Sequence, residues 1–313
     1  MTISLDMMGG DLAPLEAVKG VLQYLQSSSS PAKLVLIGDQ AQLERMLQEH
    51  LVPSGSFKIV HADQVIGMHE SPTKALKEKQ QSSIAIGFHL LASGKTDAFI
   101  SAGNTGAMLV GALFSLKALE GVIRPTISTI IPGENGGTSI LLDVGLNSDC
   151  KPEQINQFAI MGTVYAQLML GIDNPRVALI NVGEEEGKGN LLAQAAYPLL
   201  KENRHIQFIG NIEGRDVLAE KADVMVCDGF TGNIILKMAE SLYDITYRKG
   251  ITHEYFERFN FEIYGGTPVL GVSKPVIIGH GISHGKAFMN MIRVAEKMIE
   301  KDVLGKMKEE LVN

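Results

Sequence analysis

The sequence predicts a three-layer α/β fold in which a mostly parallel, buried sheet lies between two layers of helices. Short β-rich runs alternate with longer amphipathic stretches along most of the chain, as expected for crossover βα units. The strand-like runs are almost continuously apolar, which is typical of parallel strands covered on both faces. A chain of 313 residues with 45% apolar content can bury a large core, and we expect a single domain over residues 1–313.

Nine runs are expected to form strands and eight stretches to form helices. The strands are 2–6, 33–39, 57–63, 97–103, 126–132, 138–145, 176–183, 206–211 and 222–229. The helices are 14–26, 40–50, 73–93, 104–119, 152–170, 189–202, 230–248 and 284–303. Residues 249–282 break the alternation with a charged and aromatic segment followed by a Gly-, Pro- and Val-rich one, and we expect an excursion from the sheet there.

Composition excludes several classes of protein. A net charge of −7 argues against a nucleic-acid partner, because binding a duplex calls for a basic surface. Two cysteines are too few for a disulfide framework, and together with the absence of a signal-like leader they predict a cytoplasmic protein. No apolar run approaches the ~20 residues that cross a bilayer.

Four of the predicted strands end at small polar loops that contain glycine. These loops are SAGNTGA (101–107), DVGLN (143–147), NVGEEEGKGN (181–190) and CDGFTGN (227–233). Glycines at the carboxyl end of a parallel strand let backbone N–H groups approach a ligand, and the following helix directs its free amides to the same place. The pattern predicts a site for phosphate or another small oxyanion.

Common catalytic motifs are missing or incomplete. The first strand is not followed by a three-glycine dinucleotide fingerprint, and Lys188 in the loop 183–189 is followed by glycine where a nucleotide loop needs Ser or Thr. No zinc motif and no nucleophilic serine elbow occurs, so we predict no metal site. Cys150, at a helix start that would lower its pKa, and Cys227, beside a carboxylate, are weak candidates for a nucleophile. Positioning and charge stabilisation of phosphate, which is already an anion, are the chemistry that remains.

Seven motifs in order resemble the bacterial phosphate acyltransferases, which are acyl-acyl carrier protein:phosphate transacylases. They are MGGDLAP (8–14), SAGNTGA (101–107), LLDVGLN (141–147), CKPEQINQFAIMG (150–162), NVGEEEGKGN (181–190), FIGNIEGRD (208–216) and DGFTGNIILK (228–237). The resemblance implies a Rossmann-like sheet related to the phosphotransacetylases and to isocitrate- and isopropylmalate-type dehydrogenases.

The resemblance also implies an activity and its partners. A long-chain acyl-acyl carrier protein and inorganic phosphate would give acyl phosphate and free carrier protein, and a glycerol-3-phosphate acyltransferase would use the product in phospholipid synthesis. The family uses no cofactor, is homodimeric, and is cytoplasmic with peripheral contact at the inner face of the membrane.

The family's catalytic lysine and asparagine match Lys188 and Asn233. Lys188 would offset charge on phosphate or on the thioester oxygen, and Asn233 would donate a hydrogen bond there. The alternatives are a solvated lysine that neutralises Glu184–Glu186 and an asparagine that caps a helix. Further phosphate- or substrate-binding candidates, several of which could instead act as helix caps or loop ties, are Asn104, Thr105, Gly106, Asn147, Asp228 and Gly232.

The chain departs from the family pattern at three places. Leu12 stands where histidine is usual, HGISH (280–284) replaces HGSSD, and the region within 249–282 is about twenty residues shorter than in typical members, which weakens the expectation of membrane contact. Two other functions remain open: a phosphotransacetylase or phosphotransbutyrylase that acts on coenzyme A thioesters, and a dehydrogenase-like scaffold without transacylase activity.

Overall fold

The computed structural model describes residues 1–312, which form two compact units. The first unit comprises Met1–Lys117 and Phe261–Glu300, and the second comprises Ala118–Asn260 with the helix after residue 300. Each unit has its own sheet and helices. The single functional domain expected from the sequence stays a prediction.

The first unit is built on a sheet in the order β3-β2-β1-β4-β11-β10. Its strands are β1 (Thr2–Asp6), β2 (Lys33–Gly38), β3 (Phe57–His61), β4 (Ala98–Ser101), β10 (Thr267–Leu270) and β11 (Val276–Ile278). Its helices are α1 (Leu15–Ser27), α2 (Gln40–Glu49), α3 (Pro72–Glu78), α4 (Ser83–Ala92), α5 (Thr105–Ser115) and α10 (Gly285–Glu300), with a short 3-10 turn η3 (Phe261–Ile263). All neighbouring pairs are parallel except β10 with β11.

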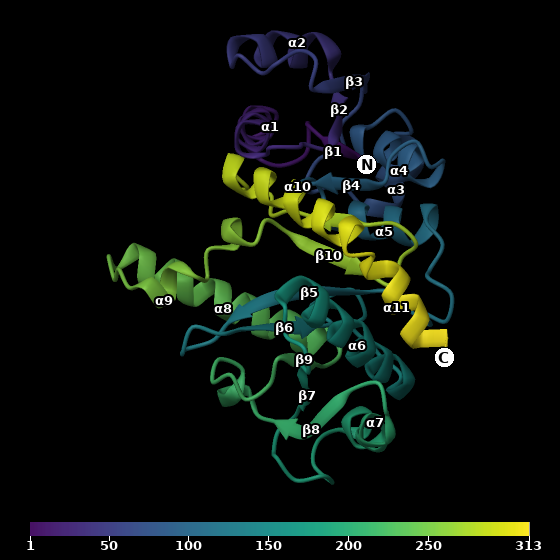
Figure 1. Ribbon diagram of the computed structural model, residues 1–313, viewed down its shortest axis with the longest axis vertical. Helices are drawn as coiled ribbons and strands as arrows, with labels where there is room; N and C mark the ends of the chain where they lie inside the picture. The colour runs from purple at the N-terminus through teal and green to yellow at the C-terminus, as the bar shows by residue number, and fades with distance from the viewer. Residues whose placement is uncertain (313) are drawn as a thin grey trace. The chain divides into compact units, whose positions relative to one another are not determined.

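Helices cover this sheet on both sides. Helices α1 and α10 pack side by side, and α4 and α5 pack together on the other side (Figure 1). Helices α1 and α10 approach closely at Gly20 of α1, where an added Cβ would lie 2.3 Å from Cβ of Phe288 in α10. The core of this unit is fully buried and includes Leu5 and Phe99.

The second unit is built on a sheet in the order β5-β6-β9-β7-β8. Its strands are β5 (Thr126–Pro132), β6 (Thr138–Leu142), β7 (Arg176–Ile180), β8 (Gln207–Ile212) and β9 (Val224–Val226). Its helices are α6 (Pro152–Tyr165), η1 (Ala166–Leu170), α7 (Leu191–Glu202), η2 (Gly214–Asp216), α8 (Gly229–Arg248), α9 (Glu254–Glu257) and α11 (Val303–Val312). Strand β5 pairs antiparallel with β6, and the pairs of β9 with β6 and β7 and of β7 with β8 are parallel.

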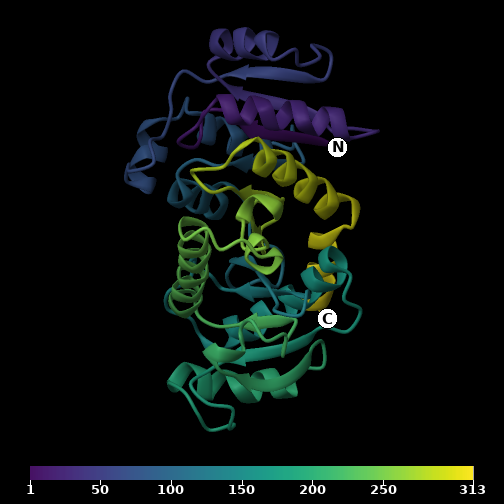
Figure 2. The ribbon, with the colours of Figure 1, turned by 90° about the vertical axis from the view of Figure 1, so that its left-hand side faces the viewer.

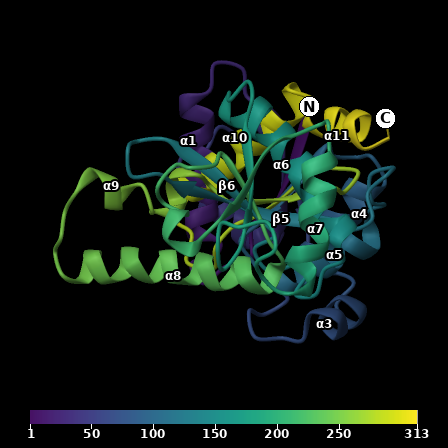
Figure 3. The same cartoon turned by 90° about the horizontal axis from the view of Figure 1, so that it is seen from below.

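Parallel pairing places the carboxyl ends of β6, β9 and β7 next to one another. The register aligns Leu142 with Val226, and Val226 with Leu179. The loops that follow these strands therefore meet at one edge of the sheet, with α7 and α8 beginning beside them. Helix α8 is the longest helix of this unit, and α9 lies toward its C-terminal end (Figures 2 and 3).

The expected fold class is confirmed, and each of the nine predicted strands is present with shifts of a few residues at its ends. The expected excursion is wrong for residues 267–278, because β10 and β11 join the sheet of the first unit. These strands were missed because they span only four and three residues and are surrounded by Gly and Pro.

Two helix predictions also need correction. The stretch 73–93 forms two helices, because the polar segment after α3 stops the first and the Ser82 hydroxyl, accepting from the Ala85 amide at 3.3 Å, caps the second. The last predicted helix ends at Glu300, and a separate helix α11 follows Asp302, whose φ of +48° breaks the helical path. Within residues 1–312, no helix is both long enough and apolar enough to cross a bilayer.

Candidate active site

The loop after β6 and the start of α8 meet backbone to backbone in the second unit. The Gly229 amide donates to the Asn147 carbonyl at 2.7 Å. A Cβ added at Gly232 would lie 1.8 Å from the Asp143 carbonyl oxygen and 3.1 Å from Sγ of Cys227. Gly232 is thus required because the helix and the loop approach more closely than any side chain allows.

Asp143 organises the loop that contains it. Its carboxylate accepts from the backbone amides of residues 145, 146 and 147 at 3.0, 3.0 and 2.7 Å and from the Asn147 side chain at 2.7 Å. Burial raises the pKa of Asp143, and these donors oppose that effect. The second amide hydrogen of Asn147 goes to the Pro125 carbonyl at 2.8 Å, so both hydrogens of this predicted ligand are already used inside the loop.

Asp228 is the N-cap of α8. Its carboxylate accepts from the Thr231 amide and from the Thr231 hydroxyl, both at 2.9 Å. Because the helix begins at Gly229, Asn233 lies beyond the cap, and the interpretation of Asn233 as a helix cap is wrong. The Asn233 side chain is exposed and packs on Gly145, where an added Cβ would lie 3.3 Å from its Oδ1. Within residues 1–312 the side-chain amide of Asn233 has no hydrogen-bond partner, so it is available to a ligand.

Two asparagines hold the loop that carries Lys188. The side chain of Asn181 donates to the Lys188 carbonyl at 3.0 Å, and the side chain of Asn211 donates to the Glu185 carbonyl at 2.9 Å. Gly189, at φ +96°, is required because a Cβ there would lie 2.2 Å from Oδ1 of Asn181. Neither asparagine was predicted as a site residue from the sequence, although Asn181 opens the loop motif NVGEEEGKGN and Asn211 lies in the motif FIGNIEGRD.

The ammonium of Lys188 is only loosely paired. It lies 4.0 Å from Glu185, and its side chain is 52% exposed. Glu184 pairs with Lys221 at 3.0 Å, and Glu186 pairs with Lys201 at 2.9 Å. Lys188 therefore does not neutralise all three glutamates, since two of them have cations of their own.

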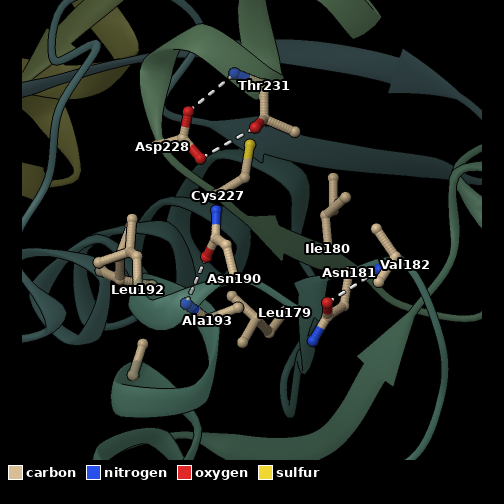
Figure 4. Close-up of a pocket in the computed structure, with 12 residues that line it drawn as sticks. Leu179, Ile180, Asn181, Val182, Asn190, Leu192, Ala193, Cys227, Asp228 and Thr231 are labelled. Carbon is tan, nitrogen blue, oxygen red and sulfur yellow. Dashed lines mark hydrogen bonds between the residues drawn. The ribbon is translucent and has the colours of Figure 1, made fainter. Parts of the chain in front are cut away.

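A pocket opens where the loops after β7 and β9 meet the first turns of α7 and α8 (Figure 4). Asn190, which caps α7 by accepting from the Ala193 amide at 2.9 Å, and Thr231 of α8 both line it. Asn190 is two residues after Lys188, and Thr231 is two residues before Asn233. The fold thus brings the two predicted catalytic segments to one cavity, and Asn190 and Thr231 join the list of site residues that the sequence did not single out.

The remaining predicted ligands, Asn104, Thr105 and Gly106, belong to the first unit. Asn104 caps α5 by accepting from the Ala107 amide at 2.9 Å. Its Nδ2 donates to three carbonyls of the loop 67–70 at 3.0, 3.2 and 3.1 Å, so its side chain is fully used inside the protein. Thr105 is exposed at the first turn of α5, where the amides of Thr105 and Gly106 have no intrahelical acceptor.

Neither cysteine has the properties of a nucleophile. Burial raises the pKa of Cys150 to about 12, so the expected lowering at a helix start is wrong. Burial also raises the pKa of Cys227 well above its ordinary value, and the nearby carboxylates Asp228 and Asp143 add to the effect. Within residues 1–312, no three His, Cys, Asp or Glu side chains are grouped so that they could hold a metal ion.

Comparison with known proteins adds the family. A family model described as "Fatty acid synthesis protein" matches residues 1–249 and 245–306, which together are nearly the whole chain. The chain belongs to the phosphate acyltransferase family. The phosphate acyltransferases of Dictyoglomus turgidum and Halothermothrix orenii are each 43% identical to it, over 99% of this chain and 98% of theirs. The activity class is therefore that of an acyl-transferring enzyme that uses phosphate.

Solved structures confirm the fold. A phosphotransacetylase from Streptococcus pyogenes aligns with a TM-score of 0.67 at 16% identity, covering 96% of this chain and 94% of that one. A branched-chain phosphotransacylase from Enterococcus faecalis aligns with a TM-score of 0.63, also at 16% identity, covering 96% and 99%. The alignments to the family members extend over 330 or 331 positions, more than the 313 residues of this chain. The shortening expected within 249–282 stays a prediction.

Proposed function

We propose that this enzyme converts a long-chain acyl-acyl carrier protein and inorganic phosphate into acyl phosphate and free carrier protein. The observation that carries the proposal is the convergence of the Lys188 loop and the first turns of α8, which carry Asn233, on one pocket in a chain of this family. The family description as a fatty acid synthesis protein supports a long-chain acyl group held on a carrier. The acyl phosphate would then serve a glycerol-3-phosphate acyltransferase in phosphatidic acid synthesis.

In the proposed reaction, a phosphate oxygen attacks the thioester carbonyl carbon. The new C–O bond forms, the C–S bond breaks, and the proton of hydrogen phosphate ends on the thiol of the carrier. Lys188 offsets the negative charge that builds up as phosphate meets the carbonyl oxygen, and the free amide of Asn233 donates a hydrogen bond to that oxygen. No covalent enzyme intermediate is needed, which agrees with the raised pKa values of both cysteines.

The other predicted ligands divide into two groups. The backbone amides of Thr105 and Gly106 are in the first turn of α5, and we propose that they contribute to phosphate binding. The Gly232 amide donates to the Asp228 carbonyl at 3.0 Å, so Gly232, predicted as a ligand, contributes through its close packing on the loop instead. The hydrogen bonds of Asn104, Asn147 and Asp228 support a positioning role for these side chains instead.

We also propose a cytoplasmic homodimer with weak peripheral contact at the inner face of the membrane. Helix α8 supports an apolar contact of some kind, because it exposes large apolar side chains at helical spacing. They are Phe230, Ile234, Met238, Leu242 and Ile245. Sedimentation velocity and vesicle co-sedimentation test the two assemblies separately.

The reaction is tested by incubating the enzyme with palmitoyl-acyl carrier protein and inorganic phosphate and trapping acyl phosphate with hydroxylamine. Lys188→Ala and Asn233→Ala should each lower kcat by about 10²–10³, the cost of losing one such group. Both side chains are exposed, so the thermal midpoint should stay within about a degree. Lys237→Ala is the matched control, since this exposed lysine of α8 pairs with Glu240 of the same helix at 2.7 Å.

The outcomes separate the candidate functions. Phosphate-dependent product that is lost in both variants but kept in the control supports the proposal. Reaction of coenzyme A thioesters alone would favour a phosphotransacetylase. If neither thioester reacted, the scaffold would lack transacylase activity.

A further inference from the structure

The pocket lined by Asn190 and Thr231 has an apolar wall. Its cavity measures about 180 Å³ and is lined by twelve residues (Figure 4). Seven of the twelve are aliphatic and come from α6, β7, α7 and the loop after β7: Ile155, Leu179, Ile180, Val182, Leu192, Ala193 and Ala196. Such a wall suits hydrocarbon, because burying apolar surface is what hydrocarbon gains from leaving water.

The charges of the lining residues argue against phosphate as the ligand of this pocket. None of the twelve lining residues is a lysine or arginine, and Asp228 contributes a carboxylate. That carboxylate is occupied by Thr231, and Asn190 uses its oxygen to cap α7. This lining fits a neutral, largely apolar group, whereas phosphate needs a cation, which the lining lacks.

The arrangement of polar and apolar lining residues indicates how an acyl thioester would be oriented in the pocket. Its polar side carries Asn190 and Thr231, which are two residues from Lys188 and Asn233, and its apolar side extends between β7 and α7. A thioester carbonyl at the polar side would leave its acyl chain pointing to the apolar side. Val182 lines the pocket and is 81% exposed, so the apolar lining continues outward to the surface.

Resting on the function proposed above, we propose that this pocket binds the first carbons of the acyl chain, those nearest the thioester. A methylene group takes about the volume of one water, ~30 Å³, so the cavity holds about six carbons. The remaining carbons of a longer acyl chain would extend past Val182 toward the surface. A pantetheine arm is disfavoured as the occupant, because its amides would be unpaired against Leu179 and Ala196.

Ala193→Leu tests this by filling the cavity, and Ala195→Leu is its control. The two alanines lie on the same helix, but Ala193 is buried in the pocket lining whereas Ala195 is exposed and outside it. Leu192→Ala enlarges the cavity and gives an independent variant. Butyryl, hexanoyl, octanoyl and palmitoyl thioesters of carrier protein are compared with saturating phosphate, and KM for phosphate is measured separately.

In the wild-type enzyme, kcat/KM should rise about fourfold per methylene up to about six carbons and then flatten. Ala193→Leu displaces about three carbons and should raise KM on the order of 50-fold for hexanoyl and longer chains, with a much smaller rise for butyryl. Leu192→Ala should move the flattening to longer chains. KM for phosphate should not change, and Ala195→Leu should match wild type.

Several results would overturn the inference. If Ala193→Leu raised KM equally for every chain length, the pocket would hold the pantetheine arm. If Ala193→Leu matched Ala195→Leu while wild type made acyl phosphate, the pocket would hold no part of the substrate, and the proposed function would stand without it. If carrier protein thioesters failed to react but coenzyme A thioesters reacted, the proposed function would fail. The same variants would then test, with coenzyme A thioesters, whether the pocket binds the acyl chain. If no thioester reacted, both proposals would fall.

Discussion

Replacing Gly232 with alanine should damage the site without touching either proposed catalytic side chain. The new Cβ would lie 1.8 Å from the Asp143 carbonyl oxygen, whereas ordinary contact begins at 3.4 Å. Helix α8 must therefore withdraw from the loop by about 1.6 Å, and Asn233, the next residue, moves with it. A displacement of 1 Å at a reacting centre costs about 10² in rate, so we expect kcat to fall by at least that factor. Overpacking against backbone should also lower the free energy of unfolding by about 1–3 kcal/mol.

Gly214→Ala is the matched control, since an added Cβ at Gly214 meets nothing within 4 Å. The hydroxylamine assay measures kcat for both variants, and thermal unfolding measures their stability. The reasoning would be refuted if Gly232→Ala kept the rate and midpoint of Gly214→Ala, because the helix and loop would then not be in contact.

Three further substitutions test other contacts. Asn104→Asp keeps the oxygen that caps α5 but replaces the donor to three loop carbonyls with an acceptor, and chemical denaturation should show a loss of about 1–3 kcal/mol. Burial alone would raise the pKa of Glu16, but hydrogen bonds from a lysine and from the Gly285 amide outweigh it and lower the pKa. The stability from Glu16 is thus present above pH 4.5 and lost as the pH falls below it, so Glu16→Gln should lower the thermal midpoint at pH 7, by a difference that shrinks toward pH 3. Glu185→Gln frees Lys188 from its 4.0 Å ion pair and should lower KM for phosphate severalfold with almost no change in midpoint; an unchanged or higher KM would count against phosphate binding by Lys188.

The sequence predicted the fold well where a strand or helix carries its own pattern. Continuous apolar runs such as 33–39 and 176–183 indicate strands buried on both faces, and the structure contains them as β2 and β7. Strands β10 and β11 escaped prediction because they are short and lie among glycine and proline residues, which are typical of turns. They form because neighbouring strands supply their hydrogen bonds, and β11 pairs with β4, far away in the sequence.

The candidate site was predicted as segments and not as contacts. The loops around Lys188 and Asn233 were selected from their glycines and from the family resemblance, and the fold brings their neighbours Asn190 and Thr231 to one pocket. The individual polar residues were harder to interpret. Asn104 was expected either to cap a helix or to bind phosphate, and only the three carbonyls of a loop more than thirty residues earlier show that its amide is already used.

The sequence by itself determined the fold class, the family and the strand-end loops, because apolar periodicity, glycine positions and ordered motifs are local properties of the chain. Only the tertiary structure decided which asparagine side-chain amides have no hydrogen-bond partner inside the protein. Asn147 is occupied by Pro125 and Asp143, whereas Asn233 has no partner within residues 1–312. A hydrogen bond depends on which distant segment lies within about 3 Å, and the one-dimensional order of residues does not contain that information. The apolar pocket has the same origin, since its lining comes from α6, β7, α7 and α8 and exists only once they have packed.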